Sequence, residues 1–498
     1  MAAFILRAVH LGGAFTHSSG LTDLTVANVQ GQLRLYTASG ADGGLSVFDL
    51  RPGRAAMIMS EVGGSSATGT LGVADVEIAT IGGQAVLAAA GRYDDEFAYR
   101  RLDTTGDFLG VAAIPSIPIS TAALTELEIV TVGTRNYLIA GRDNGGGLNV
   151  FDMTADLGLT HLATLADSVS TTLANVSDLV AFDTGQTRLV FAASGIEHGV
   201  TSAAIDSSGN LGVIDTVRGM KGLGIYQPTQ LAVAEVGGSD FLLVGAAGSN
   251  NLSVFEISPD GHLSLRDMVW DSLDTRFRNV TALDVFELND RSFVLAGGND
   301  GGMSLFELGP NGKLYILTSV TDTVATTLAS VSAIEAVNVG GEIQVFVASG
   351  NEVGMTQFSL DLGAIGNLVT PSGPVGDAVG GPGDDFLVGT DARNSLFGFA
   401  GNDRLVDGGD VDMLYGGAGA DTFVFMQDGM YDRVMDYQPG IDTIDLSDFD
   451  MVYSIADLGI HSADYGAKIM VAGEAILLVT QNGQPLSAAD FSTDGFIF

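Results

Sequence analysis

Aspartate and glycine recur at a fixed interval of nine residues between positions 380 and 424. Five consecutive nine-residue units fill this stretch, and the sixth position of each carries a carboxylate or an amide, from Asp385, Asn394, Asp403, Asp412 and Asp421. Glycines stand at the first and fourth positions of the turns. Glycine adopts backbone conformations that are closed to other residues, and it leaves its carbonyl group uncovered. These glycines are Gly380, Gly383, Gly398, Gly401, Gly416 and Gly419. Because Ca²⁺ binds six to eight oxygen ligands in flexible geometry, this spacing predicts calcium sites.

The last three residues of each unit are expected to form a short strand whose apolar eighth residue points inward. These inward residues are Leu387, Leu396, Leu405, Leu414 and Phe423. Because successive turns alternate between two sides, Asp385, Asp403 and Asp421 are expected in one row, with Asn394 and Asp412 in the other. The second unit departs from the pattern at positions 390, 392 and 394. The sequence therefore does not decide whether this unit binds calcium, and about two to four ions are expected in all.

The nine-residue units resemble the RTX repeat, G-G-x-G-x-D-x-U-x, in which U is a large apolar residue. The segment 432–447 is similar to the flank that follows the β-roll in serralysin-type proteases and other type I secreted proteins. The end, Asp494-Gly-Phe-Ile-Phe498, resembles the C-terminal export signal of that group. The resemblance implies a parallel β-roll with Ca²⁺ as its cofactor, and the type I secretion machinery as a partner. It also implies a secreted, extracellular or surface-associated protein of a Gram-negative bacterium.

Seven related segments of 51 or 52 residues precede these units. Their equivalent apolar residues are Leu24, Val76, Leu127, Leu179, Leu231, Leu283 and Ile334. Each segment holds short alternating or apolar runs bounded by Gly, Asn and Asp, which is typical of strands. Turn residues such as Asp300-Gly301 tolerate positive φ and predict a hairpin between the second and third runs. Four antiparallel strands repeated seven times predict an all-β, seven-bladed propeller.

Residues 4–9 have the pattern of a blade's fourth strand and are expected to complete the last blade, whose other strands lie within 331–360. Such a closure removes an exposed sheet edge. Units such as 252–263 resemble blades of lactonase-type seven-bladed propellers. That resemblance implies sugar-lactone hydrolysis in some members, but no catalytic residue carries over because no matching site motif occurs here.

Four regions are expected along the chain. Residues 1–366 form the propeller, and residues 367–379, with Pro371 and Pro374, form a linker or capping loop. Residues 380–450 form the RTX β-roll and its flank, and residues 451–498 form a C-terminal cap with the secretion signal.

Composition excludes several classes of protein. Sixty acidic against 21 basic residues give a formal net charge of −39, which would repel the phosphates of nucleic acid. The absence of cysteine excludes disulfides and thiolate metal sites. No apolar run approaches the length of about 18 residues that a transmembrane helix needs. Residues 1–10 lack a long apolar region and a cleavage site, so they are assigned to a strand and not to a signal peptide.

One acidic set lies in the propeller repeats. Asp23, Asp75, Glu126 and Asp178 share one repeat position in the first four blades, where later blades have Gln or Ala. Because innermost strands surround the central channel, these acids could converge at its mouth and bind a cation or a polar ligand. The alternative, which we prefer, is that each accepts backbone hydrogen bonds at a blade junction.

The sequence favours a non-catalytic extracellular binding or structural protein over an enzyme. It has neither the H-E-x-x-H motif of zinc proteases nor the G-x-S-x-G motif of serine hydrolases. Self-assembly at the cell surface, as a surface layer, filament, matrix or adhesin, is one expected form of this function, with a second copy or a surface glycan as partner. The alternative is a secreted hydrolase of the lactonase type with its site at the propeller mouth.

Overall fold

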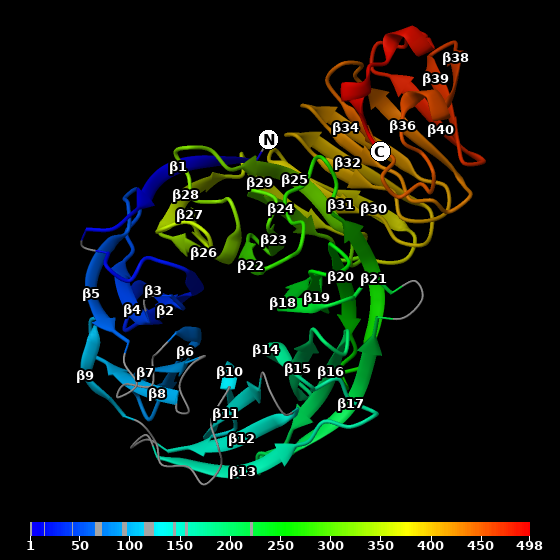
Figure 1. Cartoon of the computed structure of the whole chain (residues 1–498). Helices are drawn as coiled ribbons and strands as arrows, with labels where there is room; N and C mark the ends of the chain where they lie inside the picture. Colours follow the sequence, from blue (N-terminus) through cyan, green and yellow to red (C-terminus); the bar gives the residue numbers. More distant parts are fainter. Residues whose placement is uncertain are drawn as a thin grey trace.

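The computed structural model describes residues 2–13, 15–41, 43–64, 72–91, 97–113, 124–142, 146–154, 158–219 and 223–498. Figure 1 shows seven sheets arranged as a ring, with an elongated second domain beside it. Each sheet of the ring has four antiparallel strands, and the first strand of each of the seven repeats lies nearest the centre. The predicted all-β architecture, a seven-bladed propeller followed by a β-roll, is confirmed.

The first four blades follow the chain in order. Blade 1 is β2 (Leu21–Val29), β3 (Gln32–Ser39), β4 (Gly44–Asp49) and β5 (Met57–Gly63). Blade 2 is β6 (Val73–Ile81), β7 (Gln84–Gly91), β8 (Phe97–Leu102) and β9 (Phe108–Ala113). Blade 3 is β10 (Leu124–Val132), β11 (Arg135–Arg142), β12 (Leu148–Met153) and β13 (Leu159–Leu165). Blade 4 is β14 (Val176–Asp183), β15 (Arg188–Ser194), β16 (Gly199–Ile205) and β17 (Leu211–Arg218).

The remaining blades include the one that closes the ring. Blade 5 is β18 (Pro228–Val236), β19 (Ser239–Ala246), β20 (Asn251–Ile257) and β21 (Leu263–Trp270). Blade 6 is β22 (Ala282–Leu288), β23 (Arg291–Gly297), β24 (Gly302–Leu308) and β25 (Leu314–Thr321). Blade 7 is β26 (Val331–Val339), β27 (Glu342–Ser349), β28 (Met355–Asp361) and the N-terminal strand β1 (Ala3–His10). Because β1 pairs antiparallel with β28, the two ends of the propeller are held in one sheet.

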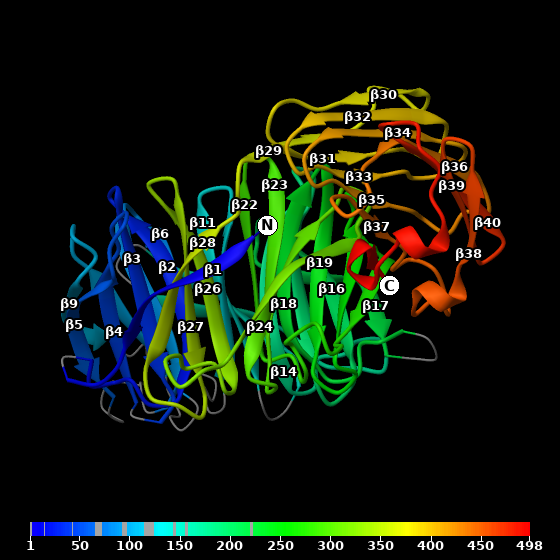
Figure 2. The same ribbon diagram turned by 90° about the horizontal axis from the view of Figure 1, so that it is seen from above.

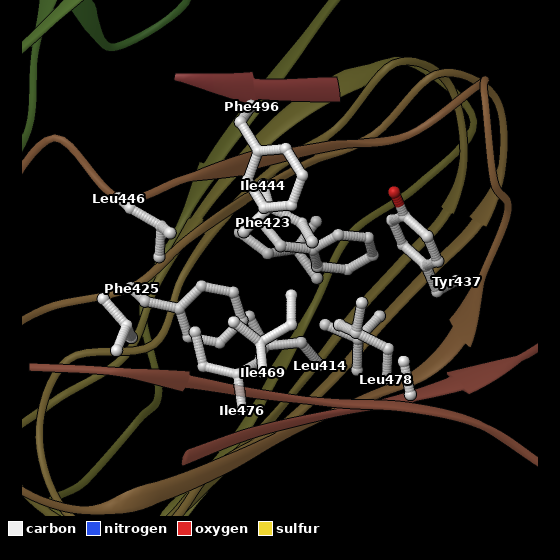
Figure 3. Packing of buried hydrophobic residues seen from close by; sticks show 14 of the residues in the cluster. Leu414, Phe423, Phe425, Tyr437, Ile444, Leu446, Ile469, Ile476, Leu478 and Phe496 are labelled. Carbon is white, nitrogen blue, oxygen red and sulfur yellow. The ribbon is translucent and has the colours of Figure 1, made fainter. Parts of the chain in front are cut away.

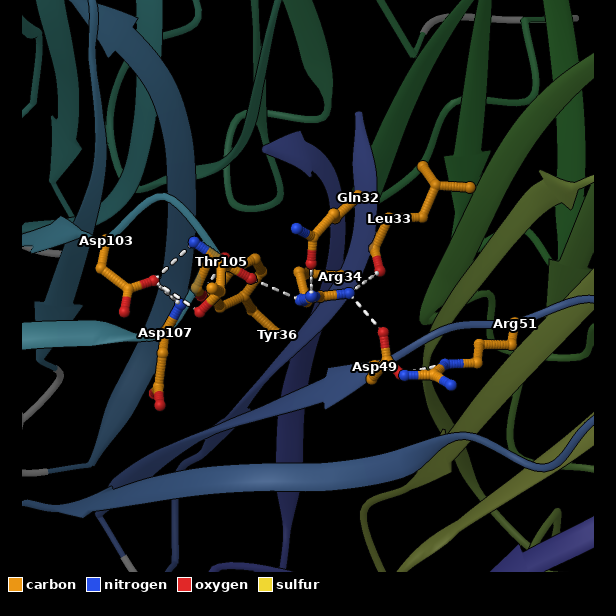
Figure 4. A network of polar contacts seen from close by, with 10 residues as sticks. Gln32, Leu33, Arg34, Tyr36, Asp49, Arg51, Asp103, Thr105 and Asp107 are labelled. Carbon is orange, nitrogen blue, oxygen red and sulfur yellow. Dashed lines mark hydrogen bonds and ion pairs between the residues drawn. The ribbon is translucent and has the colours of Figure 1, made fainter. Parts of the chain in front are cut away.

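Neighbouring blades are joined by apolar packing and by polar contacts at their edges. Figure 4 shows one such network between blades 1 and 2. The Arg34 guanidinium pairs with Asp49 of its own blade and donates to the carbonyl of Thr105 at 2.7 Å. The Tyr36 hydroxyl donates to the carbonyl of Gly106 at 2.6 Å. These contacts fix the angle between the two sheets.

The second domain is a solenoid of two facing sheets. One sheet is entirely parallel and consists of β29 (Ile365–Val369), β31 (Asp384–Val388), β33 (Arg404–Val406), β35 (Thr422–Val424), β37 (Thr443–Asp445) and β41 (Phe496–Ile497). We call it the inner sheet because it faces the propeller. The outer sheet consists of β30 (Gly376–Val379), β32 (Asn394–Ala400), β34 (Met413–Ala418), β36 (Tyr431–Tyr437), β40 (Glu474–Thr480), β39 (Gly466–Val471) and β38 (Gly459–Ala463). Three short 3₁₀ helices occur in this domain: η1 (Ile455–Asp457), η2 (Ala488–Asp490) and η3 (Thr493–Gly495).

Apolar residues fill the space between the two sheets (Figure 3). The five eighth-position residues expected to point inward are fully buried there: Leu387, Leu396, Leu405, Leu414 and Phe423. The segment 367–379, for which we expected a linker, holds the end of β29 and all of β30. Ala378 of β30 is buried in the same core, so an apolar residue in a Gly- and Pro-rich stretch already starts the solenoid. At the other end, Phe496 of the segment resembling an export signal packs in this core as well.

The solenoid contacts blade 6 through its inner sheet (Figure 2). The Tyr315 ring of β25 meets the Phe386 ring of β31 edge to face at 5.4 Å. The outward-facing valines of three successive inner strands join this cluster: Val388, Val406 and Val424. The inner sheet therefore has an apolar core on one face and the propeller on the other.

A buried ion pair lies at the same interface. The Arg291 guanidinium contacts both carboxylate oxygens of Glu307, at 2.5 and 2.9 Å, and both side chains are almost fully buried. Arg291 also donates to the carbonyl of Asp384 in the solenoid at 2.6 Å. Because a buried charge without its partner is costly, this pair ties blade 6 to the first turns of the solenoid.

Candidate metal centre

Carboxylates link successive turns of the solenoid along its two sides. On one side, Oδ1 of Asp403 accepts the backbone N–H of Asp385 at 2.8 Å, and Oδ1 of Asp421 accepts that of Asp403 at 2.9 Å. On the other side, Oδ1 of Asp412 accepts the N–H of Asn394 at 2.5 Å. Each bond spans 18 residues, which is two nine-residue units. The structure therefore places the sixth-position residues in the two rows expected from the sequence.

The second carboxylate oxygen distinguishes these aspartates. In Asp403, Asp412 and Asp421 the Oδ2 atom is buried and has no hydrogen-bond partner among the described residues. Leaving a buried charged oxygen unpaired is costly, so such atoms mark a place where a cation fits. Asp385 differs in that its Oδ2 accepts the N–H of Gly381.

The predicted glycines leave room beside these oxygens. A Cβ on Gly398 would lie 2.3 Å from Oδ2 of Asp403, and one on Gly416 would lie 2.2 Å from Oδ2 of Asp421. A Cβ on Gly380 would lie 2.5 Å from Oδ2 of Asp385. The fourth-position glycines have a different role, because they stack on one another's backbone. The Cβ contacts would be 3.0 Å to the Ala364 carbonyl for Gly383, 2.3 Å to the Gly383 carbonyl for Gly401 and 1.7 Å to the Gly401 carbonyl for Gly419.

Burial disfavours the charged form of these carboxylates when no cation is near. It raises the pKa of Asp403 to about 7, with further repulsion from Asp421 and Asp385. It raises the pKa of Asp412 to about 7 and that of Asp421 to about 6. A bound cation would reverse this preference, since an opposite charge favours the ionised carboxylate. Buried carboxylate oxygens beside open glycine turns therefore fit Ca²⁺, which takes carboxylate and carbonyl ligands.

The second unit has a different arrangement at its amide. Oδ1 of Asn394 accepts from both the backbone N–H and the hydroxyl of Thr390, at 2.6 and 3.0 Å. Its Nδ2 donates to the carbonyls of Pro374 and Gly376 at 3.3 and 3.2 Å. The neutral amide of Asn394 thus finds its hydrogen-bond partners within the protein. This explains why Thr390 and Asn394 stand in this turn in place of the Gly and Asp of the repeat.

Two further aspartates extend the rows and were missed by sequence reasoning. Oδ1 of Asp432 accepts the N–H of Asp412 at 2.8 Å, and Oδ1 of Asp442 accepts that of Asp421 at 3.2 Å. Burial raises the pKa of each to about 7. These links span 20 and 21 residues, so the nine-residue frame does not reach them. Their signal was the Asp-rich flank at 432–447.

The acids of the propeller repeats line one cavity of about 510 Å³ at the central channel. The four predicted residues, Asp23, Asp75, Glu126 and Asp178, all lie on its wall. Among the described residues, no three carboxylates or imidazoles stand close enough together to hold a metal ion between them. These acids therefore share the channel without forming a metal cage from their own side chains.

Most of the channel acids accept a backbone N–H from the next blade. Asp23 accepts that of Val76 at 3.0 Å, and Asp75 that of Leu127 at 2.6 Å. Asp178 accepts that of Leu231 at 2.5 Å. Two acids that the sequence did not reveal accept the same kind of bond. Asp284 accepts the N–H of Ala336 at 2.7 Å, and Glu335 accepts that of Val26 at 3.0 Å. This geometry matches the preferred alternative, in which the acids stabilise blade junctions.

Burial changes the acidity of these channel acids and of the neighbouring Glu128. Burial raises the pKa of Asp23 and Asp284 to about 6 and that of Asp178 to about 7. It raises the pKa of Glu128 to about 8, with added repulsion from Asp178. Burial therefore favours the protonated form of these carboxyl groups.

A family model described as Peptidase M10 serralysin C terminal matches residues 352–481. The match covers the end of the propeller and most of the solenoid, about a quarter of the chain. A search of curated proteins gives no match. No helix in the described part of the chain has the length and apolar character to cross a membrane.

Solved structures resemble the chain at low identity. A protein from Lactobacillus plantarum is 18% identical over 61% of this chain and 86% of its own, with a TM-score of 0.45. A proposed 6-phosphogluconolactonase from Bacteroides uniformis is 13% identical over 64% and 88%, with a TM-score of 0.47. Another from Bacteroides fragilis is 12% identical over 64% and 87%, with a TM-score of 0.45. No activity transfers to this chain at such similarity.

Proposed function

We propose that this chain is a secreted calcium-binding protein whose solenoid becomes ordered when Ca²⁺ enters its turns. The observation that carries the proposal is the set of buried, unpartnered Oδ2 atoms on Asp403, Asp412 and Asp421, each in a glycine-rich turn. The match to the serralysin C-terminal family supports it, because members of that group are exported and bind calcium.

The carboxylate rows act as the sensor in this proposal. Without a cation, the buried charges of each row repel one another and disfavour the folded turns. A divalent cation supplies the opposite charge, and the aspartates with the uncovered glycine carbonyls would hold it. Extracellular calcium modules bind at about 10⁻⁴–10⁻³ M, so the solenoid would stay unfolded in the exporting cell and fold outside. Passage through a type I secretion channel would fall between these two states.

The propeller would present a binding or structural surface and would not be an enzyme. Its channel acids bind neighbouring blades, which supports a structural role for them over a catalytic one. We propose a role at the cell surface as part of a layer, filament, matrix or adhesin. The lactonase-type alternative has no described site residue in its favour.

Chelation of calcium in the full chain tests this function. With EGTA we expect loss of far-UV β-signal from the solenoid and proteolytic cleavage confined to residues after about 365, while the propeller resists. Adding Ca²⁺ back should restore both, and Mg²⁺ serves as a control because it demands stricter geometry. An unchanged spectrum and cleavage pattern with EGTA would falsify the proposal.

A further inference from the structure

The two outward faces of the solenoid have the same apolar pattern but different surroundings. On the inner sheet, the ninth-position valines are covered by blade 6. On the outer sheet, the matching positions are Val379, Phe397 and Tyr415, which lie side by side on three adjacent parallel strands. Val379 is 52% exposed, and the neighbouring Phe399 is 56% exposed. Among the described residues, no element of the chain packs over this stripe.

The aromatic rings of the stripe stack on one another. The Phe397 and Tyr415 rings stack with centroids 4.6 Å apart and an interplanar angle of 17°. The Phe399 ring stacks on Phe397 at 6.5 Å. Phe399 is exposed, and Phe397 and Tyr415 are half-buried. Aligned aromatic rings at the surface of a sheet are typical of a contact surface, because monomeric proteins rarely expose contiguous apolar area.

A second row of outward side chains crosses the same face and changes charge from one end to the other. Strand pairing aligns its members in the order Asp377, Ser395, Met413, Arg433, Leu477, Lys468 and His461. The acidic end is on β30, and the basic end is on β36, β39 and β38. This concentration of basic residues is unusual in a chain with 21 basic and 60 acidic residues.

Within the described part of the chain, the two cations at the basic end have no acidic partner. Both the Arg433 guanidinium and the Lys468 ammonium lie over the Tyr431 ring, at 5.3 and 5.9 Å. In the described ranges neither forms an ion pair with a carboxylate. Two unpaired cations beside an apolar stripe indicate a surface made to meet an acidic, apolar partner.

We propose that a second copy of this chain is that partner, and that the outer sheet is the contact face of a homodimer. A two-fold axis parallel to the strands reverses the order of strands in the facing sheet. It therefore brings Asp377 of one copy toward Lys468 and His461 of the other, and it lays the apolar stripe on β30, β32 and β34 against β38, β39 and β40 of the other copy. One surface that complements itself in this way is what an isologous dimer requires.

The area of the face suits such a contact. Seven strands spaced about 4.8 Å apart span about 29 Å, and strands of about six residues run about 20 Å. The product is a sheet area of roughly 600 Å², to which the side-chain surfaces add. This is close to the roughly 800 Å² that each partner buries in a standard interface. The dimer rests on the proposed function, since the face exists only when the solenoid is ordered.

Sedimentation velocity on the full chain in excess Ca²⁺, over a wide concentration range, tests this inference. Wild type should sediment as a dimer, and Lys468→Asp should weaken dimerisation at least about tenfold by placing like charges together. The double variant Asp377→Lys with Lys468→Asp should restore the dimer, which a general folding defect would not do. Leu273→Ser is the control, because it removes a 91% exposed apolar side chain of the propeller and should leave the dimer intact.

Circular dichroism on the same samples separates the two proposals. A chain whose solenoid orders with Ca²⁺ but which stays monomeric overturns the dimer alone. The dimer also fails if the basic row binds an acidic polysaccharide while no second copy associates. A chain that dimerises with an ordered solenoid in EGTA overturns the calcium proposal and leaves the contact face standing.

Discussion

Carboxylates join neighbouring repeats in both domains, but their second oxygens have different surroundings. In the propeller, Asp75 accepts the N–H of Leu127 in the next blade and lines an open cavity of about 510 Å³. In the solenoid, Asp403 accepts the N–H of Asp385 two units earlier, and its other oxygen is sealed without a partner. Asp75 faces a cavity although burial raises its pKa, whereas the unpartnered oxygen of Asp403 can be satisfied only by a cation or a proton.

These surroundings indicate which domain depends on a cation. The contact between repeats is chemically the same in the two domains, so the acidic residue alone does not define a calcium site. The solenoid adds a glycine beside two of these oxygens, since Gly398 lies beside Asp403 and Gly416 beside Asp421. We therefore expect calcium to control the solenoid and leave the propeller's own stability almost unchanged.

The interface between the domains gives the largest expected effect. Arg291→Met leaves Glu307 buried without its partner and removes the bond to the Asp384 carbonyl, which should cost about 3–5 kcal/mol. The solenoid should then need more Ca²⁺ to fold, because it loses its attachment to blade 6. Thermal melting at several calcium concentrations measures both effects. Arg51→Met is the control, since the Arg51 side chain pairs with Asp49 while 60% exposed. Equal calcium midpoints for the two variants would show that the domains fold independently.

The glycine beside a sealed oxygen gives the next effect. Gly398→Ala places a Cβ where we expect the cation, 2.3 Å from Oδ2 of Asp403. Overpacking of this kind costs about 1–3 kcal/mol, and calcium binding at this turn should be lost as well. Titration calorimetry should find fewer bound ions per chain. Gly373→Ala, whose Cβ would meet nothing within 4 Å, should bind calcium as wild type does. An unchanged ion count for Gly398→Ala contradicts the assignment of this turn.

Exchange of acid and amide in the two rows sharpens the comparison. The double variant Asp403→Asn with Asp421→Asn should lose about 1.4 kcal/mol of calcium-linked stability per site at ten times Kd. At limiting Ca²⁺, where the solenoid is only partly saturated, the same variant should be at least as stable as wild type, because a buried charge is removed. Asn394→Asp is the reciprocal change and should be less stable at limiting Ca²⁺ but respond more steeply to added Ca²⁺. Melting temperatures against free calcium test this pair. Parallel curves for all three proteins would mean that the unpartnered Oδ2 atoms do not bind calcium.

Repeat length made much of this architecture predictable from sequence. Segments of 51 or 52 residues identified the blades, and the nine-residue frame identified the buried Leu405 and Leu414 and the two carboxylate rows. Contacts outside these frames were not predictable. Asp432 and Asp442 continue the rows at spacings of 20 and 21 residues, because the chain lengthens its turns there.

The channel shows a second reason for missed residues. Sequence reasoning followed one position of the innermost strand, which is Ala282 in blade 6 and Ala333 in blade 7. The acids of these blades, Asp284 and Glu335, lie two residues further along. Side chains two apart in a strand point to the same face, so both positions reach the channel. The hydrogen bond from Arg291 to the Asp384 carbonyl could not be predicted either, because no local sequence pattern connects the two domains.

A further prediction concerns pH and the propeller. Burial raises the pKa of Asp178 to about 7 and that of Glu128 to about 8, well above those of unfolded carboxyl groups. Between about pH 4 and pH 8 the folded propeller therefore binds more protons than the unfolded chain. Its stability should increase as pH falls through this range, by about 1.4 kcal/mol per pH unit for each extra proton bound.

Melting of the full chain in EGTA isolates this effect, because we expect the solenoid to be unfolded under that condition. Glu128→Gln keeps an acceptor for the Ala181 N–H and removes one charge, so the propeller should gain stability at pH 8 and show a shallower pH dependence. Glu287→Gln changes an exposed carboxylate on β22 and should keep the wild-type slope. A propeller that instead loses stability between pH 8 and pH 5 would mean that its channel acids are solvated well enough to stay ionised. The contrast with the sealed oxygens of the solenoid would then be larger than the structure indicates.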